Sequence, residues 1–255
     1  MTLLGTSETG VSIVIPAWNE GARIGKTLDS LLAEFEATAS PFEVIVVSDG
    51  STDDTAAIAA RFSSRGVRLL DFPSRLGKGD AVMVGLRDAK FDRVGFLDAD
   101  GPVAPQDIIR ILKALDEFDG AIASRYVRDG SVVSRRPFSR AILSRLWNLA
   151  ARGVLLVPVR DFQCGAKFFR SSVLKEVLPS VAVSNWAFDA SLIFHFHELG
   201  FRLQEVPVKW SDSSGSKVVL AEDVPSMLIS LVGVRVLSKP FARRVSSLLF
   251  RRATS

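Results

Sequence analysis

The sequence predicts an α/β fold in which a mostly parallel central sheet carries helices on both faces. Short apolar, β-branched runs alternate with amphipathic helical patterns up to about residue 123, and this alternation is typical of parallel sheets. A chain of 255 residues is long enough to bury a substantial core in one large domain. A (β/α)8 barrel also fits this length, but it needs eight strand–helix units, and the alternation weakens after five.

The first strand is predicted over 11–15, where the apolar run ends at Pro16. A helix over 24–35 follows from apolar residues at i, i+4, i+7, i+8 and i+11, which share one face. After the second strand, over 44–47, acidic residues mark the first turn of a helix over 55–63, where the helix dipole favours negative charge.

Three further strands are predicted over 67–70, 94–97 and 121–123. The helices between them are expected over 80–89 and 106–118, and Pro105 stands at the first turn of the second one, where proline is tolerated. The remaining elements are expected to form a mixed second half on the same sheet: helices over 141–157 and 188–199, and a strand over 203–208.

The positive charge of the chain is concentrated at its C-terminal end. The net charge is +4, but residues 235–255 hold six basic residues and no acid, which leaves 26 basic and 28 acidic residues in the body. A near-neutral body argues against a nucleic-acid-binding face. No stretch approaches the ~18 uninterrupted apolar residues of a membrane span, the N-terminus lacks the pattern of a signal peptide, and the single Cys164 excludes an internal disulfide.

The strand over 94–97 leads directly into Asp98-Ala99-Asp100. Two carboxylates at this spacing are able to hold a divalent cation against a diphosphate, because Mg²⁺ and Mn²⁺ are commonly shared between one or two carboxylates and substrate phosphates. The alternative is that these residues only form a turn after the strand.

Polar residues follow all five predicted strands of the first half. In an open α/β sheet ligands bind beyond the carboxyl ends of the strands, so these loops are expected to meet at one edge. The residues concerned are 16–20, 48–53, 72–79, 98–100 and 124–126. Together they offer an aromatic side chain, carboxylates, a lysine between two glycines and an arginine.

In this order the motifs resemble family 2 glycosyltransferases with the GT-A fold, and within that family the polyprenyl- or dolichyl-phosphate mannose and glucose synthases. The resemblance spans about 200 residues and rests on Ile15-Pro16-x-x-Asn19-Glu20, Asp49-Gly50-Ser51-x-Asp53-x-Thr55, Gly77-Lys78-Gly79, Asp98-x-Asp100, Ser124-Arg125, Asp161-x-Gln163-Cys164-Gly165-x-Lys167, Trp186-Ala187-Phe188-Asp189, Glu205-Val206-Pro207-Val208-x-Trp210 and Gly215-Ser216-Lys217. It implies a GT-A Rossmann-like fold with a catalytic domain over 1–220 and a C-terminal amphipathic segment over 221–255.

On the nucleotide side, the resemblance implies that Pro16, Trp18 and Glu20 line the nucleoside pocket. Asp49 is then expected to accept a hydrogen bond from the base, and Lys78 to contact the nucleotide. The alternatives are core packing for Trp18, a turn role for Asp49, and a helix start for Lys78.

For the diphosphate, the resemblance implies that Asp100 is the main ligand of Mg²⁺ or Mn²⁺ and that Asp98 contacts the nucleotide sugar directly or through the metal. Lys217 is expected to reach the diphosphate, so Asp100, Arg125 and Lys217 are the predicted catalytic residues. Many family members carry a Gln two residues after the second Asp, whereas this chain has Pro102. A backbone carbonyl or water is expected there instead, or weaker metal binding.

For the acceptor, the resemblance implies a lipid-phosphate pocket made of Arg125, Arg140 and Ser144. Arg140 and Ser144 are spaced i, i+4 and so share one helix face, and guanidinium groups suit phosphate. The expected reaction is inverting transfer of a hexose to polyprenyl or dolichyl phosphate. Mannose from GDP-mannose is ranked narrowly ahead of glucose from UDP-glucose. The motifs also fit a transferase of the same fold that acts on a non-lipid acceptor, and a silent, membrane-associated module that only binds a sugar nucleotide.

The C-terminal segment predicts where this reaction occurs. Phe241, Val245, Leu248 and Leu249 are spaced as one apolar helix face beside basic residues, which is typical of a helix lying in a membrane interface. Residues 223–252 are therefore expected to contact the membrane surface, with the enzyme peripheral on the cytoplasmic face. The alternative is a helix docked on the domain or on another copy.

Overall fold

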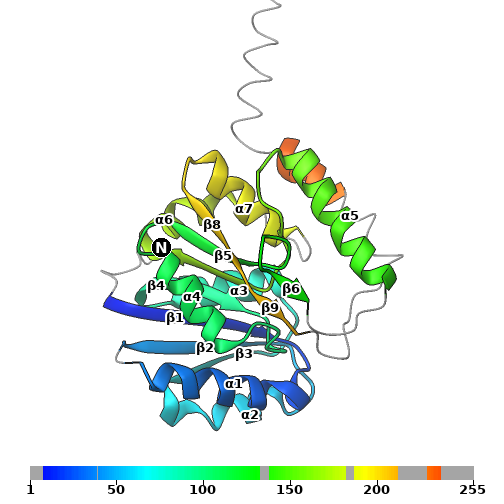
Figure 1. Cartoon of the computed structure of the whole chain (residues 1–255). Coiled ribbons are helices and arrows are strands. Elements are labelled where there is room, and N and C mark those ends of the chain that lie inside the picture. Colours follow the sequence, from blue (N-terminus) through cyan, green and yellow to red (C-terminus); the bar gives the residue numbers. More distant parts are fainter. Residues whose placement is uncertain (1–7, 39, 133–137, 182–186, 212–228, 237–255) are drawn as a thin grey trace, which may run out of the picture.

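The computed structural model describes residues 8–38, 40–132, 138–181, 187–211 and 229–236 (Figure 1). Within these ranges a seven-stranded sheet has the order β3-β2-β1-β4-β7-β5-β8. Its strands are β1 Glu8–Ala17, β2 Phe42–Asp49, β3 Val67–Phe72, β4 Phe91–Leu97, β5 Gly120–Ser124, β7 Ala166–Arg170 and β8 Leu203–Pro207. Strand β7 is antiparallel to β4 and β5, and the other neighbouring pairs are parallel. The mostly parallel sheet is confirmed.

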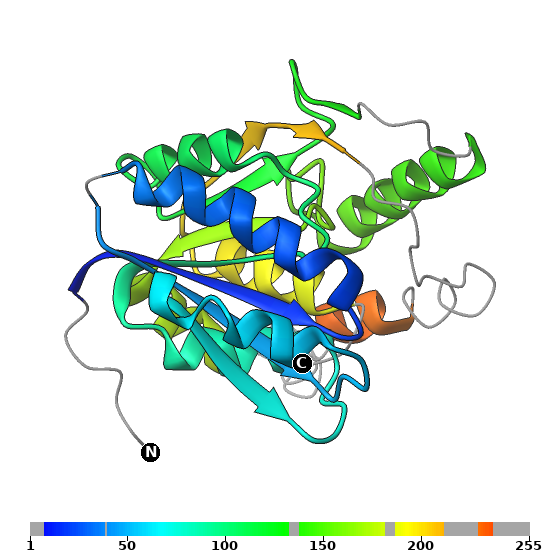
Figure 2. The same cartoon turned by 90° about the horizontal axis from the view of Figure 1, so that it is seen from below.

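Helices cover both faces of this sheet, as predicted (Figure 2). One face carries α1 Gly21–Glu36, α2 Thr55–Ala60 and α4 Pro105–Ala114, and the other carries α3 Lys78–Asp88, α6 Ser171–Val177 and α7 Phe188–Glu198. Short 3-10 helices lie at η1 Ser63–Arg65 and η2 Leu178–Ser180, and a separate two-stranded sheet pairs β6 Ser131–Val132 with β9 Lys209–Trp210.

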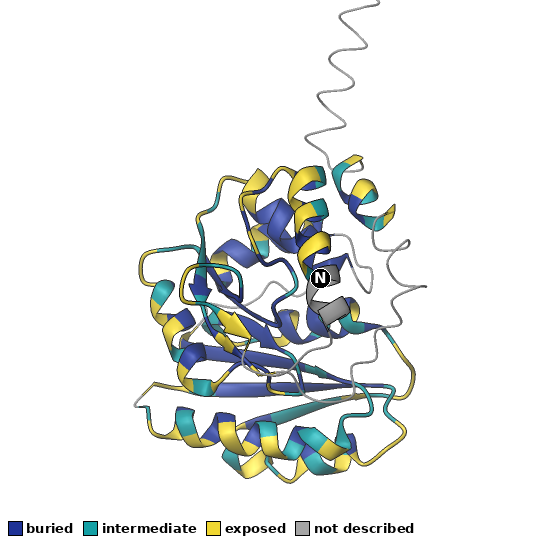
Figure 3. Cartoon of the chain, turned by 45° about the vertical axis from the view of Figure 1, so that its right-hand side comes forward, coloured by how far each residue is buried: buried dark blue, intermediate teal, exposed yellow. Residues whose placement is uncertain are grey.

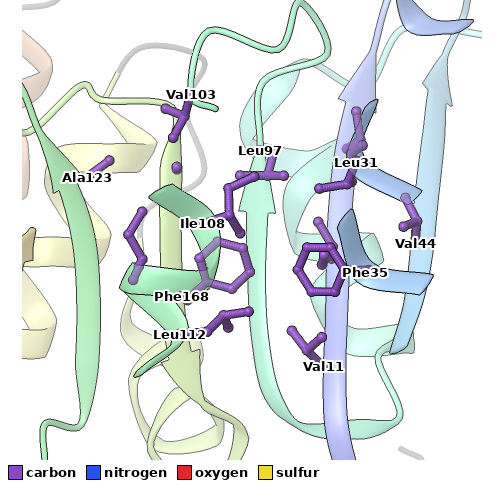
Figure 4. Close-up of a cluster of buried hydrophobic side chains, with 14 of the residues drawn as sticks. Val11, Leu31, Phe35, Val44, Leu97, Val103, Ile108, Leu112, Ala123 and Phe168 are labelled. Atoms are coloured by element: carbon purple, nitrogen blue, oxygen red, sulfur yellow. The ribbon is translucent and has the colours of Figure 1, made fainter. Parts of the chain in front are cut away.

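The core follows from the alternation of side chains along the strands. In β1, Ile13 and Ile15 face the α1 side, whereas Val14 faces the α3 side. Phe35 of α1 and Phe168 of β7 lie in the same buried cluster of the first face (Figure 4). Figure 3 shows the result: the sheet is buried and the outer surfaces of the helices are exposed. The helices packed on the two faces of the sheet therefore hold the strand ends, and with them the polar loops, in fixed positions.

A third buried cluster joins α5 Phe138–Leu155 to the helix over 229–236. Trp147 and Ala151 of α5 belong to the same cluster as Leu231 and Val234. Beside this cluster, several apolar side chains of the two helices and of Leu156, which directly follows α5, are exposed, and we call this set the apolar face: Leu146, Leu149, Leu156, Ile229, Val232 and Val236. None of the helices in the described ranges is long and apolar enough to cross a membrane.

Several element boundaries differ from the sequence prediction; the helix predicted over 106–118, for example, ends at Ala114. Strand β1 does not end before Pro16 but continues to Ala17, and Pro16 pairs in parallel register with Val47. Proline is compatible with an extended backbone near the end of a strand, where one missing N–H disturbs little pairing. The predicted helix over 55–63 ends at Ala60, and η1 and then Gly66, at φ 85°, turn the chain into β3.

Candidate active site

The five polar loops of the first half meet at one edge of the sheet. Strands β1, β2, β3 and β4 are parallel neighbours, and β5 runs in the same direction because β7 lies antiparallel between β4 and β5. The predicted convergence of the loops at the carboxyl ends of these strands is therefore confirmed, and the candidate site lies there.

Asp49, at the end of β2, fixes the loop that precedes α3. Its buried carboxylate accepts hydrogen bonds from the backbone N–H groups of Leu76 and Gly77, the latter at 3.1 Å. Gly50 has φ +63°, and a Cβ there would lie 2.6 Å from the backbone nitrogen of Arg75, so the loop approaches too closely for any other residue. The turn-forming alternative for Asp49 is thus observed, and its contact with a base stays a prediction.

Trp18 and Glu20, in the loop after β1, both contact arginines. The guanidinium of Arg75 lies 3.7 Å from the ring centroid of half-buried Trp18, in a cation–π stack. The carboxylate of Glu20 accepts from the guanidinium of Arg23, at 2.6 Å. Trp18 lies outside the buried apolar clusters of the described residues, which argues against a core role.

A cavity of about 420 Å³ opens between α1, α4 and the loop that follows β4. Asp98 and Asp100 both line it, and Arg23 and Lys26 of α1 contribute positive charge. The loop is anchored to α1 because the hydroxyl of Thr27 donates to the carbonyl of Ala99 at 2.9 Å. The carboxylates therefore stand at the wall of a space that a ligand can enter.

The donor set in this loop fits a metal that binds together with a diphosphate. Among the described residues, no group of three or more Asp, Glu, His or Cys side chains gathers at one point, so the described side chains do not form a complete cage. The carbonyl of Pro102 already accepts from the N–H of Ser211 at 2.9 Å. Asp100 and Asp98 are the two carboxylates that this loop offers, which matches the pattern in which one or two carboxylates and substrate phosphates share Mg²⁺ or Mn²⁺.

Beside Asp98, four charged side chains form a chain of contacts that we call the charged quartet. Lys78 Nζ lies 2.7 Å from Asp98 Oδ1 and 3.9 Å from Asp189 Oδ2, and Lys167 Nζ lies 2.6 Å from Asp189 Oδ1. Lys78 begins α3 and Asp98 directly follows β4. Asp189 lies in the first turn of α7, and Lys167 lies in β7. The quartet lies on the α3 and α7 side of the sheet and adjoins the cavity through Asp98.

The pKa values follow from this mixture of burial and opposite charge. Burial alone would lower the pKa of Lys78, but the charges of Asp98 and Asp189 outweigh it and raise that pKa. Burial would raise the pKa of Asp189, but Lys167 and Lys78 outweigh it and lower that pKa. The pKa of Asp98 is raised, chiefly by burial and partly offset by Lys78. Lys78 therefore stays an ammonium and Asp189 a carboxylate near neutral pH.

Gly165 determines where the Asp98 carboxylate lies. The N–H of Asp98 donates to the carbonyl of Gly165 at 2.9 Å. A Cβ on Gly165 would fall 1.7 Å from Asp98 Oδ2, so only glycine leaves room for the carboxylate. The Asp98 side chain is thus held between Gly165 and Lys78.

Arg125, at the end of β5, is buried in a bidentate ion pair. Its Nε and Nη2 donate to the two oxygens of Asp161, each at 2.7 Å. Asp161 is held in turn because its N–H donates to Glu205 of β8 at 3.1 Å. The guanidinium also lies 4.9 Å from the ring centroid of Trp210, and the backbone of Trp210 bridges to Val103, next to the loop of Asp98 and Asp100.

Tyr126, the residue after Arg125, connects this arginine to Ser144. The hydroxyl of Tyr126 donates to Ser144 Oγ at 2.8 Å, and the Tyr126 ring centroid lies 5.2 Å from the Arg125 guanidinium. The structure thus brings Ser144 and Arg125 to the same region. Arg140 falls within α5, but its side chain is not among those described, and Lys217 lies outside the described residues.

Among the contacts of the site that were not predicted from the sequence are the Arg75 stack on Trp18, the Tyr126 hydrogen bond, the Arg125–Asp161 ion pair and the contacts of Lys167 in the quartet. Lys167 had the clearest signal, because a lysine in the apolar strand Ala166–Arg170 must find a partner if the strand is buried. The partner itself, Asp189, stands 22 residues later, and sequence spacing does not reveal such a pairing.

Comparison with known proteins identifies the family. The sequence profile of glycosyl transferase family 2 matches residues 12–178, which contain the loops after β1 to β5 and most of the quartet. The chain belongs to this family. It is a glycosyltransferase with a GT-A Rossmann-like fold.

Curated relatives of this glycosyltransferase cover most of the chain. The dolichyl-phosphate beta-glucosyltransferase of Drosophila melanogaster is 34% identical over 229 residues, covering 82% of this chain and 69% of that protein. The human protein of the same name is 29% identical over 230 residues, with the same two coverages of 82% and 69%. These names favour glucose over the predicted mannose of GDP-mannose.

Solved structures support the fold of this glycosyltransferase. Glucosyl-3-phosphoglycerate synthase from Mycobacterium tuberculosis, in complex with Mn²⁺, UDP and glucosyl-3-phosphoglycerate, aligns with a TM-score of 0.65 at 21% identity, covering 89% of this chain and 79% of that one. TarS from S. aureus, in complex with UDP-GlcNAc, aligns with a TM-score of 0.63 at 18% identity, covering 91% and 68%. At these identities the likeness shows the shared fold.

Proposed function

We propose that this glycosyltransferase moves glucose from UDP-glucose onto a dolichyl or other polyprenyl phosphate. The observation that carries the proposal is the 34% identity, over 82% of the chain, to a protein named dolichyl-phosphate beta-glucosyltransferase. The arrangement of carboxylates and cations around the cavity beside Asp100 supports it chemically.

On the donor side, Asp100 would hold Mg²⁺ or Mn²⁺, with Asp98 beside it. When bound, the ion supplies positive charge to the diphosphate that leaves. Lys78 stands at the same sheet edge as a second cation, and Trp18 with Arg75 offers a flat surface at the loop after β1. Lys217 is proposed to add a further cation, as its motif suggests.

On the acceptor side, the attacking group is an oxygen of the lipid phosphate. It forms a bond to the anomeric carbon, while the bond from that carbon to the diphosphate oxygen breaks and UDP leaves with the electron pair, so the configuration inverts. A phosphate monoester is largely dianionic near neutral pH, with a second pKa of about 6, so a strong general base is not needed. Arg125 uses only part of its five N–H donors on Asp161, and the others remain to orient the phosphate with Ser144 and Arg140.

The donor is tested by incubating the protein and Mn²⁺ with dolichyl phosphate and either UDP-glucose or GDP-mannose, and then measuring the radiolabelled sugar lipid. We expect UDP-glucose to be used at least tenfold faster, because enzymes discriminate by ~1–3 kcal/mol even on small differences in a pocket. Faster transfer from GDP-mannose would contradict the proposed sugar, and hydrolysis of donor without transfer to the lipid would contradict the acceptor.

A lipid phosphate acceptor also suggests which surface of the protein contacts the membrane. We propose that the apolar face of α5 and the helix over 229–236 rests on the membrane surface, together with the C-terminal segment over 221–255. The face exposes leucine side chains to 55% at Leu146 and 65% at Leu149, and a polyprenyl phosphate is embedded in a lipid bilayer. Burying such side chains in an interface stabilises binding, as for other amphipathic helices.

Replacing Leu146 and Leu149 with serine is expected to weaken binding to vesicles of phosphatidylcholine and phosphatidylserine by at least about a hundredfold, because each leucine fully buried in the interface contributes ~1.5–3 kcal/mol and two are lost. Sedimentation with vesicles measures this, and Leu199→Ser, at an exposed leucine at the end of α7, is the control. Removal of 235–255 should reduce the salt-sensitive part of binding. Unchanged binding in both variants would refute the membrane proposal.

A further inference from the structure

The charged quartet runs from the protein interior to the edge where the donor is proposed to bind. The exposed fraction of the side chain rises from 0% at Lys167 to 10% at Asp189 and 35% at Lys78. Along this path Lys167 is positive, Asp189 is negative and Lys78 is positive, and Asp98 adds a negative charge at the cavity. The quartet as a whole is neutral.

The inner end of this path is fixed by several contacts. The Lys167 ammonium donates to Asp189 Oδ1 at 2.6 Å and to the carbonyl of Cys164 at 2.7 Å, and it lies 5.3 Å from the ring centroid of Phe96. A fully buried ammonium is costly unless it is paired and hydrogen-bonded in this way. Lys167 therefore keeps one oxygen of Asp189 in place.

The outer end depends on the other oxygen of Asp189. Asp189 Oδ2 is 3.9 Å from Lys78 Nζ, and Asp98 Oδ1 is 2.7 Å from the same nitrogen. Two carboxylates thus hold the Lys78 ammonium, and Gly77, which is fixed by Asp49, holds the backbone beneath it. Without Lys167, the three remaining charges would sum to −1 and repel a diphosphate.

We propose that Lys167 and Asp189 are positioning residues that set the location of the Lys78 ammonium for the donor diphosphate. This rests on the proposed function only in that the donor is a nucleoside diphosphate sugar. Lys167 and Asp189 act through Lys78. The Asp189 carboxylate contacts the ammonium groups of Lys78 and Lys167, so it is not assigned the role of a base for the acceptor.

The test is the paired change Lys167→Met with Asp189→Asn, which removes one positive and one negative charge together and leaves no buried ion alone. Calorimetry with Mg²⁺ and UDP-glucose, without acceptor, measures donor affinity. We expect the dissociation constant to rise about tenfold, the scale of one charge-assisted hydrogen bond, while far-UV circular dichroism is unchanged. Lys78→Met should raise it similarly, and the combined triple variant should show little additional loss, because residues acting as one unit are not additive.

The matched control is Arg93→Met with Asp116→Asn, an ion pair of 2.8 Å on exposed side chains at the other end of β4. It should leave donor affinity within twofold of the wild type. A folded Lys167/Asp189 variant with wild-type affinity, or a full additive loss in the triple variant, would overturn the proposal.

A measurement on the unaltered protein covers the case in which the paired variant does not fold. Nitrogen-15 spectra of the lysine ammonium groups should show the Lys78 signal shifting when Mg²⁺ and UDP-glucose are added, with the Lys167 signal retained. No response of Lys78 to the donor would also overturn the proposal. If GDP-mannose proves to be the donor, the same comparisons are made with it, so failure of the sugar assignment and failure of the positioning role give different results.

Discussion

Replacing Asp100 with asparagine is expected to lower kcat/KM for sugar transfer by about a hundredfold to a thousandfold. Asn keeps the shape of the side chain but removes the charge that the proposed metal needs, and loss of one electrostatic contact to a leaving group costs about 10²–10³ in rate. Asp100 lines the cavity next to α1 and is one of two carboxylates in this loop. Initial rates measured against Mn²⁺ concentration should show both a lower maximum and a weaker dependence on the ion.

The control for this prediction is Asp80→Asn, at an exposed acid in the first turn of α3. It removes the same charge near the same edge of the sheet, but outside the residues that line the cavity, and should keep nearly full activity. Chelation of divalent ions should reduce the wild type to the level of the Asp100 variant. Full transfer by the Asp100 variant would contradict the proposed metal role.

Replacing Arg125 with methionine is expected to destabilise the fold by about 3–5 kcal/mol, because Asp161 would be left as an unpaired buried charge. Both partners are almost fully buried and share two hydrogen bonds of 2.7 Å. At ~2–4 °C per kcal/mol for a domain of this size, the melting temperature should fall by roughly 6–20 °C. Thermal unfolding followed by circular dichroism measures this.

Two further variants locate the cause of this loss. Adding Asp161→Asn to Arg125→Met should recover part of the melting temperature, because no buried charge then remains alone. The exposed Arg93→Met variant should change stability by less than about 1 kcal/mol, as surface ion pairs do. A small effect of Arg125→Met would show that the arginine serves the acceptor alone and not the fold.

The sequence was informative where chemistry and local periodicity coincide. Apolar spacing predicted α1, and the polar residues after the first five strands predicted one shared edge, because parallel strands place their carboxyl ends together. The pair Asp98 and Asp100 was recognisable because it follows a strand directly.

Contacts between distant segments were harder to predict. Strand β7 lies between β4 and β5 although it follows both in the chain, so the order of strands along the sequence hid its place. Lys167 finds Asp189 only because its side chain leaves β7 on the face of the sheet that carries α7. The choice of sugar depends on side chains around a bound donor, which composition and spacing do not encode.

Trp210 contacts both the loop of Asp100 and the buried Arg125, the two parts of the candidate site. Its backbone bridges to Val103, next to the loop of Asp100, while its ring lies against Arg125. Ser211 then ties the same loop through Pro102. The two-residue strand Lys209–Trp210, which lies outside the main sheet, consequently links Arg125 to the loop of Asp100 and helps to set the distance between the proposed acceptor and donor sites. Substitutions in this short strand would alter that distance without changing the seven-stranded sheet.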